Sequence, residues 1–235
     1  MFNNLNVLLV NDDGFDARGI YELALIAKSI FKKVVVIAPL KEQSAVSHAM
    51  TLRKGMRFQK ELDIIPGVDT YSLDGRPSDC VKFGVIHLNY KPDIVLSGIN
   101  NGLNLGDDIL YSGTVACCFE AGLMNIKSIA FSCEINEFDT AKYVKETLEY
   151  IYNNNYLKNQ LILNVNMPLE KRGFKITKQG RNPFNTYFEE VNGLYYAKGV
   201  PLGKDVENDP DTDVFSYHHG YISITPLTVD RTNYK

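Results

Sequence analysis

The sequence predicts an α/β protein with a Rossmann-like, mostly parallel, doubly wound sheet and a C-terminal β-hairpin extension. The first observation is that short apolar runs alternate with helix-like segments as far as Pro168, an order typical of a parallel sheet covered by helices. The second is that this alternation stops after Pro168, where strand-like segments follow one another with glycine and asparagine at the turns. We therefore expect one sheet-based core followed by a β-rich extension.

Local patterns predict each element of the core. A β-branched run that ends at a proline, such as 34–38 before Pro39, indicates a strand. Apolar residues three and four apart, as in 19–30, indicate an amphipathic helix. A helix that joins two such strands makes a βαβ unit with parallel strands and a right-handed crossover. The expected elements are strand 7–10, helix 19–30, strand 34–38, short strands within 54–73, helix 78–88, strand 93–97, helix 114–123, strand 128–132, helix 140–152 and strand 161–165.

The extension is predicted to be mainly β-structure. His218 and His219 fall in a strand-like stretch, so we expect them to face opposite sides and not to share one ion. We accordingly expect residues 1–168 to form the Rossmann-like core that carries the functional site. Residues 169–235 are expected to serve oligomer contacts and not to form an independent domain. The expected elements here are strands within 174–188 and 194–200, a polar loop over 203–213 and a strand over 220–225.

The composition restricts the possible functions. The chain has 235 residues and a formal net charge of -3, which gives no electrostatic basis for binding polymeric nucleic acid. Four cysteines without a CxxC pair argue against a disulfide scaffold and against structural zinc. The apolar run near the N-terminus is short and leads directly into Asp12 and Asp13, which fits neither a signal peptide nor a membrane span. We therefore expect a cytoplasmic protein without membrane contacts.

Oxygen-bearing side chains follow several predicted strands. Asp12 and Asp13 come directly after strand 7–10, Ser44 lies in the loop after Pro39, and Asn100 follows strand 93–97. In an open α/β sheet, residues just beyond the carboxyl ends of different strands meet in one crevice. Carboxylate, amide and hydroxyl oxygens suit Mg²⁺, Mn²⁺ or Ca²⁺ and disfavour zinc or copper. These side chains therefore predict one divalent cation, although an Asp-Asp-Gly turn and a serine cap explain the same residues locally.

A phosphate site is predicted beside this cation. Glycines at 98, 102 and 106 would let backbone N–H groups approach an anion, and Asn104 lies between two of them. Ser112, Gly113 and Thr114 open an apolar helix whose free N–H groups favour a bound anion. Ser112 as a plain helix cap is the local alternative. The pattern is neither GxGxxG nor a P-loop, so nicotinamide or ATP binding gains little support.

The ordered motifs of the chain resemble those of the SurE (survival protein E) family of metal-dependent 5'-nucleotidases. The resemblance covers most of the chain, and the longest and most specific motif lies between Ser97 and Glu120. The matching segments are 11–14 with Ala17, Gly19 and Ile20, then 44–51, 77–80, 97–106, 111–115 with Glu120, and 212–213 with 220–227.

The resemblance implies hydrolysis of nucleoside 5'-monophosphates with one divalent cation held by Asp12, Asp13, Ser44 and Asn100. It also implies phosphate contacts near Asn104 and Ser112 to Thr114, and a homodimer or homotetramer assembled through the C-terminal hairpins. We expect Asp12 or Asp13 to accept a proton from the attacking water, and the same site would admit 3'-nucleotides or short polyphosphate. Two alternatives are an aspartyl-phosphate mechanism and a non-catalytic, metal-dependent module that binds nucleotides or anions.

Overall fold

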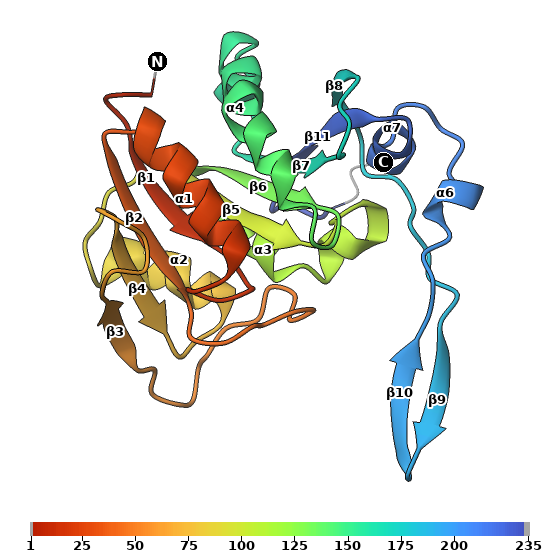
Figure 1. Cartoon of the computed structure of the whole chain (residues 1–235), viewed down its shortest axis with the longest axis horizontal. Helices are drawn as coiled ribbons and strands as arrows, with labels where there is room; N and C mark the ends of the chain where they lie inside the picture. Colours follow the sequence, from red (N-terminus) through yellow and green to blue (C-terminus); the bar gives the residue numbers. More distant parts are fainter. Residues whose placement is uncertain (1, 233–235) are drawn as a thin grey trace.

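A nine-stranded sheet runs through residues 2–232, the part of the chain that the computed structural model describes (Figure 1). Its strand order is β3-β4-β2-β1-β5-β6-β7-β11-β8, and the six strands from β4 to β7 in this order are parallel. The predicted mostly parallel α/β sheet is therefore confirmed. The strands are β1 (Asn6–Val10), β2 (Lys33–Pro39), β3 (Phe58–Glu61), β4 (Asp69–Leu73), β5 (Ile94–Asn101), β6 (Lys127–Cys133), β7 (Ile162–Met167), β8 (Gly173–Ile176) and β11 (Tyr221–Leu227).

Helices cover both faces of this sheet (Figure 1). In β1, Val7 and Leu9 pack against one face while Leu8 and Val10 pack against the other, because successive side chains of a strand alternate. A strand buried on both faces can consist of apolar residues throughout, and this explains the continuous apolar run. The first face is covered by α1 (Arg18–Ile30) and α4 (Val144–Asn153), the second by α2 (Pro77–Ile86) and α3 (Gly113–Leu123).

The remaining helices are short. The helix expected over 140–152 begins as a 3-10 helix and becomes α-helical only from Val144. None of the helices within residues 2–232 combines the length and the apolar content that a membrane-spanning segment needs. The short helices are η1 (Gly106–Leu110), η2 (Phe138–Tyr143), α5 (Tyr156–Asn159), α6 (Gly203–Val206) and α7 (Asp213–His218).

The extension contributes to two sheets. β8 and β11 lengthen the main sheet, whereas β9 (Tyr187–Val191) and β10 (Leu194–Lys198) form a separate antiparallel hairpin that projects from the body (Figure 1). We call this hairpin the arm; every one of its strand residues is exposed. The strand prediction for 174–188 was wrong in its middle, because 177–186 forms only isolated bridges.

The stretch around the two adjacent histidines is helical, and the prediction of a strand there was wrong. Thr212 caps α7, since its side chain accepts a hydrogen bond from the backbone N–H of Phe215 at 3.3 Å. A threonine cap of this kind stabilises the first turn of a helix. His219 therefore follows the helix end and stacks on Phe215 with ring centroids 3.8 Å apart. The loop expected over 203–213 likewise contains the single turn α6.

Candidate active site

A cavity of about 840 Å³ lies beyond the carboxyl ends of β1 and β5. The chain leaves β1 toward β2 on one side and later returns to place β5 on the other side, so the cavity occupies the topological switch point of the sheet. The turn after β1, the loop after β2, the end of β5 with the loop that follows it, and the start of α3 all contribute residues to this cavity. The predicted site residues among its lining are Asp12, Asp13, Ser44, Asn100, Asn104 and Ser112.

The turn after β1 is shaped by Asn11. Its buried side chain donates to the carbonyl of Gly14 at 2.8 Å and accepts from the N–H of Gly14 at 3.2 Å. Gly14 has φ +116°, a conformation that side chains disfavour. This closed turn presents the two neighbouring aspartates to the cavity from the end of a fully buried strand.

Asp12 is the more deeply buried of the two aspartates, at 4 % exposure. Burial raises the pKa of Asp12, and hydrogen bonds from the Thr114 hydroxyl and from the backbone N–H groups of Thr114 and Gly113 oppose that rise. A Cβ atom at Gly113 would lie 2.8 Å from the Asp12 side chain. Gly113 and Thr114 thus lie at the start of α3 in contact with Asp12, and they are not among the residues that line the cavity.

Asp13 is partly open to the cavity. Burial, followed by the negative charge of Asp12, raises the pKa of Asp13 to about 7. The backbone N–H of Asn101 donates to its carboxylate at 3.3 Å and opposes the rise. Two adjacent carboxylates in a partly buried site repel each other, and this is the repulsion that a bound cation relieves.

Asn100 lies near the end of the central strand β5 and not in a loop beyond it. The strand contains a register shift between Ser97 and Asn100 and continues to Asn101. The Asn100 side chain donates to the carbonyl of Gly102 at 2.8 Å, and the Thr114 hydroxyl lies 3.4 Å from its Oδ1. The Asn100 amide oxygen and the Asp12 carboxylate therefore share the Thr114 hydroxyl as a neighbour.

Ser44 is exposed in the loop between β2 and β3. Its hydroxyl donates to the carboxylate of Glu42 at 2.6 Å, and Glu42 lines the same cavity. The neighbouring residue Gln43 ties the loop to the aspartate turn, because its N–H donates to the carbonyl of Asp12 at 2.7 Å. Sequence reasoning missed Glu42, although a carboxylate two residues before a predicted ligand was the available signal.

Asn104 is held by a buried amide network. Its backbone N–H donates to Asn166 at 2.8 Å, its carbonyl accepts from Asn164 and Asn166, and its side chain donates to Ser132 at 2.8 Å. These partners come from β6 and β7, and all are fully buried. The network fixes the loop that follows β5, and no local pattern in the sequence revealed it.

The C-terminal extension also holds this loop. Asp213, which is fully buried, accepts from the N–H of Gly106 at 3.0 Å and from that of Gly180 at 2.8 Å. Asn182 donates to Asp108 at 2.7 Å, and burial raises the pKa of Asp108 to about 6. Residues far along the chain thereby position the segment that leads into α3.

The chain was compared with known proteins. The family model described as Survival protein SurE matches residues 7–186. The chain belongs to the SurE family. The matched region contains every predicted site residue and ends just before the arm. This SurE-family chain is 42% identical to a protein named 5'-nucleotidase SurE from Thermoanaerobacter sp. (strain X514), over 98% of this chain and 94% of the relative.

Other SurE proteins give the same result. A protein of the same name from Clostridium tetani is 42% identical, over 98% of this chain and 96% of the relative. A crystal structure of the Sure protein from Aquifex aeolicus has a TM-score of 0.81 and 37% identity, over 97% of this chain and 95% of the other. The SurE fold therefore extends over nearly the whole chain.

The donor set of this SurE site consists of oxygens. Within residues 2–232 no group of three or more His, Cys, Asp or Glu side chains is arranged to hold a metal. The lining of the cavity offers carboxylate oxygens, such as those of Asp12 and Asp13, together with neutral hydroxyl and amide oxygens. Such a set suits hard cations.

Proposed function

We propose that this chain is a divalent-metal-dependent 5'-nucleotidase that hydrolyses nucleoside 5'-monophosphates to nucleoside and phosphate. The observation that carries the proposal is full-length similarity to relatives named 5'-nucleotidase SurE. The cavity at the switch point supports it, because it offers acidic and neutral oxygen donors and has room for a small organic phosphate.

One cation (Mg²⁺, Mn²⁺ or Ca²⁺) would be held by Asp12, Asp13, Ser44 and Asn100. These residues line one cavity and offer two carboxylates, a hydroxyl and an amide oxygen, which is the donor chemistry of hard divalent cations. The raised pKa of Asp13 reflects charge repulsion from Asp12 as well as burial. The donor set therefore fits such a cation. When bound, the cation would polarise the phosphoryl oxygens and lower the pKa of a water.

The two aspartates would then act differently. Asp12 is fixed by Thr114 and the start of α3, so its role would be to hold the cation in place. Asp13 is less buried than Asp12 and faces the cavity, which suits a proton acceptor for the attacking water. Either aspartate would thus be catalytic, with Asp13 as the better placed base.

The start of α3 would stabilise charge on the phosphate. The Ser112 oxygen accepts from the N–H of Val115 at 3.0 Å, so its hydrogen remains to donate to a phosphate oxygen. Gly113 and Thr114 would contribute through the positive end of the helix behind Asp12. Asn104 would support the phosphate through the loop that its amide network fixes. Such donors act on the charge that develops during the reaction.

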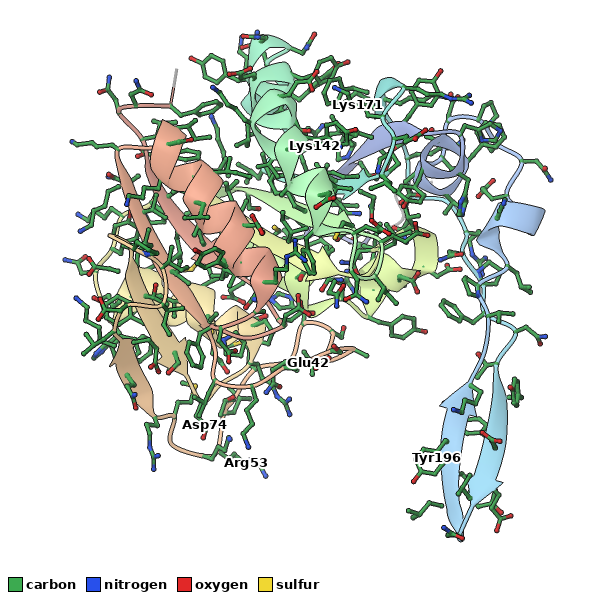
Figure 2. All side chains as sticks on the ribbon, viewed as in Figure 1. Glu42, Arg53, Asp74, Lys142, Lys171 and Tyr196 are labelled. Carbon is green, nitrogen blue, oxygen red and sulfur yellow. The ribbon has the colours of Figure 1, made fainter. Side chains whose placement is uncertain are left out.

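The proposed partners are a nucleoside monophosphate and further copies of the chain. The arm exposes Phe188 at 68% and Tyr195 at 69%, and Tyr196 projects from it (Figure 2). Exposed apolar groups gathered on a projecting hairpin are typical of an interaction surface. We therefore propose a homodimer or homotetramer assembled through the arm, with no role for polymeric nucleic acid or membrane. The four cysteines are unpaired, and this supports a reducing compartment such as the cytoplasm.

A phosphate-release assay with AMP tests this function. With Mn²⁺ we expect turnover, and an excess of chelator should abolish it. Asp13→Ala should lose turnover while its circular dichroism spectrum stays that of the wild type. Nucleotide binding without any phosphate release would favour the non-catalytic module, and retained activity in Asp13→Ala would remove the central assignment.

A further inference from the structure

The loop that carries Ser44 packs against the apolar core through Met56, at the end of the loop that is distant in sequence from Ser44. None of residues 40–57, which we call the Ser44 loop, is buried. Figure 2 labels Glu42 and Arg53 on its two halves. A segment without buried residues opens easily unless polar contacts hold it. The position of the Ser44 hydroxyl relative to the two aspartates therefore depends on the polar contacts of this loop.

A buried carboxylate on α3 provides the central contact. Glu120 is 2 % exposed, its Oε2 lies 3.0 Å from Nε2 of His48, and its Oε1 lies 3.2 Å from Nζ of Lys82. The hydrogen bond with His48 is the main cause that lowers the pKa of Glu120. A buried carboxylate without partners is strongly unfavourable. The loop conformation in which His48 contacts Glu120 is therefore favoured.

Two residues, one on either side of His48, make further contacts. Ser47 donates from its N–H to the carbonyl of Tyr111 at 2.8 Å and from its hydroxyl to the carbonyl of Leu110 at 2.7 Å. The N–H of Thr51 donates to the Asp79 carboxylate at 3.0 Å. Together with the bond from the Gln43 N–H to the Asp12 carbonyl, these contacts fasten the loop to the aspartate turn, the segment before α3, α3 itself and the start of α2.

These contacts join residues from three motifs, and the proposed reaction gives none of these residues a chemical step. His48 belongs to the segment 44–51, Asp79 to the segment 77–80, and Glu120 closes the longest motif. Asp79 also accepts from the N–H of Arg76, the residue just before α2. The three motifs meet at one loop, and that loop bears a proposed metal ligand.

We propose that Glu120 and His48 are positioning residues, whose mutual contact holds the Ser44 loop so that the Ser44 hydroxyl faces the cation held by Asp12 and Asp13. The inference rests on the proposed metal site and assigns to it a supporting pair outside the cavity lining. Neither residue would touch the substrate. Outer partners of metal ligands commonly govern the affinity of the site for its metal.

The affinity of the full chain for Mn²⁺ tests the pair. It is measured from the electron paramagnetic resonance signal of free Mn²⁺, which falls as the ion binds. His48→Ala should raise the Kd for Mn²⁺ by about tenfold, as losses of such outer partners do. His48→Gln keeps an N–H donor and should restore a Kd near that of the wild type. His87→Ala removes an exposed histidine outside this loop and should leave the Kd unchanged. The unfolding midpoints of the three variants should stay close together, because Lys82 remains a partner of the buried Glu120 carboxylate when His48 is removed.

A second readout needs no metal. Arg53 and Lys54 are exposed in the Ser44 loop, and trypsin should cleave there several times faster in metal-free His48→Ala than in the wild type or in His48→Gln. Glu120→Gln offers the same test from α3. We expect it to weaken the contact with His48 and to raise the Kd for Mn²⁺. An unchanged Kd in both His48→Ala and Glu120→Gln would overturn the inference, even if cleavage became faster.

The outcomes separate this inference from the proposed function. If the wild type binds Mn²⁺, Asp13→Ala does not, and His48→Ala binds as the wild type does, the metal site stands and the positioning pair is refuted. If the wild type fails to bind Mn²⁺, or Asp13→Ala binds it equally well, the metal site itself is refuted together with this inference.

Discussion

Two neighbouring aspartates at the end of β1 have different environments. Asp12 is buried and bonded to Thr114, whereas Asp13 is partly open and has a pKa of about 7. The sequence alone predicts the pair, since an Asp-Asp-Gly turn after an apolar strand is a local pattern. It does not predict the difference, because Thr114 lies 102 residues further along the chain. At the scale of residues, the sequence predicts which side chains bear the candidate chemistry, but it does not predict the distant residues that contact them.

The raised pKa of Asp13 predicts how the stability of the metal-free protein depends on pH. Between the ordinary value of 3.8 and about 7, the folded state holds this proton more tightly than the unfolded state. The free energy of unfolding should therefore fall as the pH rises through this window. Asp13→Asn cannot titrate at this position, so its decline should be shallower than that of the wild type. Urea unfolding at several pH values measures both slopes.

Added Mn²⁺ provides the control for this prediction. Because a cation competes with the proton for the carboxylates, the stabilisation by Mn²⁺ should grow as the pH rises. Equal slopes for wild type and Asp13→Asn without metal would contradict the assignment of the raised pKa to Asp13.

The elements of the core follow local patterns, and those of the extension depend on distant contacts. The strands and the longer helices up to β7 were predicted, because apolar periodicity and proline or glycine boundaries are local signals, whereas the short helices η1 and α5 were not. The segment 177–186 has strand-like residues, yet Gly180 and Asn182 bond to Asp213 and Asp108 instead of to a neighbouring strand. At the scale of elements, tertiary contacts overrode propensity in the extension.

The Asp213 side chain links the extension to the loop after β5, and its substitution tests this link. In Asp213→Asn the amide can present only one oxygen, which should keep the bonds to Gly180 and Val214 and lose the bond to Gly106. We expect faster hydrogen exchange at the Gly106 N–H. Asp213→Ala leaves all three N–H groups without this partner and should cost about 3 kcal/mol of unfolding free energy.

Hydrogen exchange by NMR and urea unfolding measure these two effects. Asp211→Asn, an exposed neighbour, is the matched control and should change neither. Wild-type protection at Gly106 in Asp213→Asn would show that the extension does not hold this loop.

The whole molecule combines a two-sided core with an arm that lies outside it (Figure 1). The core follows from the sequence because β1 and β2 are apolar on both faces, and α1 and α4 each have one apolar side. The projecting arm was predicted as part of the C-terminal β-hairpin extension, but its position apart from the main sheet was not predicted. Its strands carry residues of high β-propensity, and this propensity does not show whether a strand pairs with the main sheet or stands apart from it. An isolated hairpin is marginally stable in water, and this argues for contacts between copies.

Removal of apolar side chains from the arm should therefore weaken assembly. We expect the wild type to be a dimer or a tetramer in solution and Phe188→Ser with Tyr195→Ser to shift toward the monomer, because the buried apolar area would be lost. Light scattering after size-exclusion chromatography measures the mass. Tyr152→Ser, at an exposed tyrosine of α4, should keep the wild-type mass. A wild-type monomer, or a double variant that assembles normally, would contradict the role of the arm.

The central claim is that side chains from three separate stretches hold one cation at the switch point of the sheet. Anomalous diffraction from a crystal soaked in Mn²⁺, recorded at the manganese absorption edge, tests this claim most directly. We predict a single strong peak among the carboxylates of Asp12 and Asp13, the amide oxygen of Asn100 and the hydroxyl of Ser44. A map with no peak there, or with its peak bound by other residues, would contradict the account.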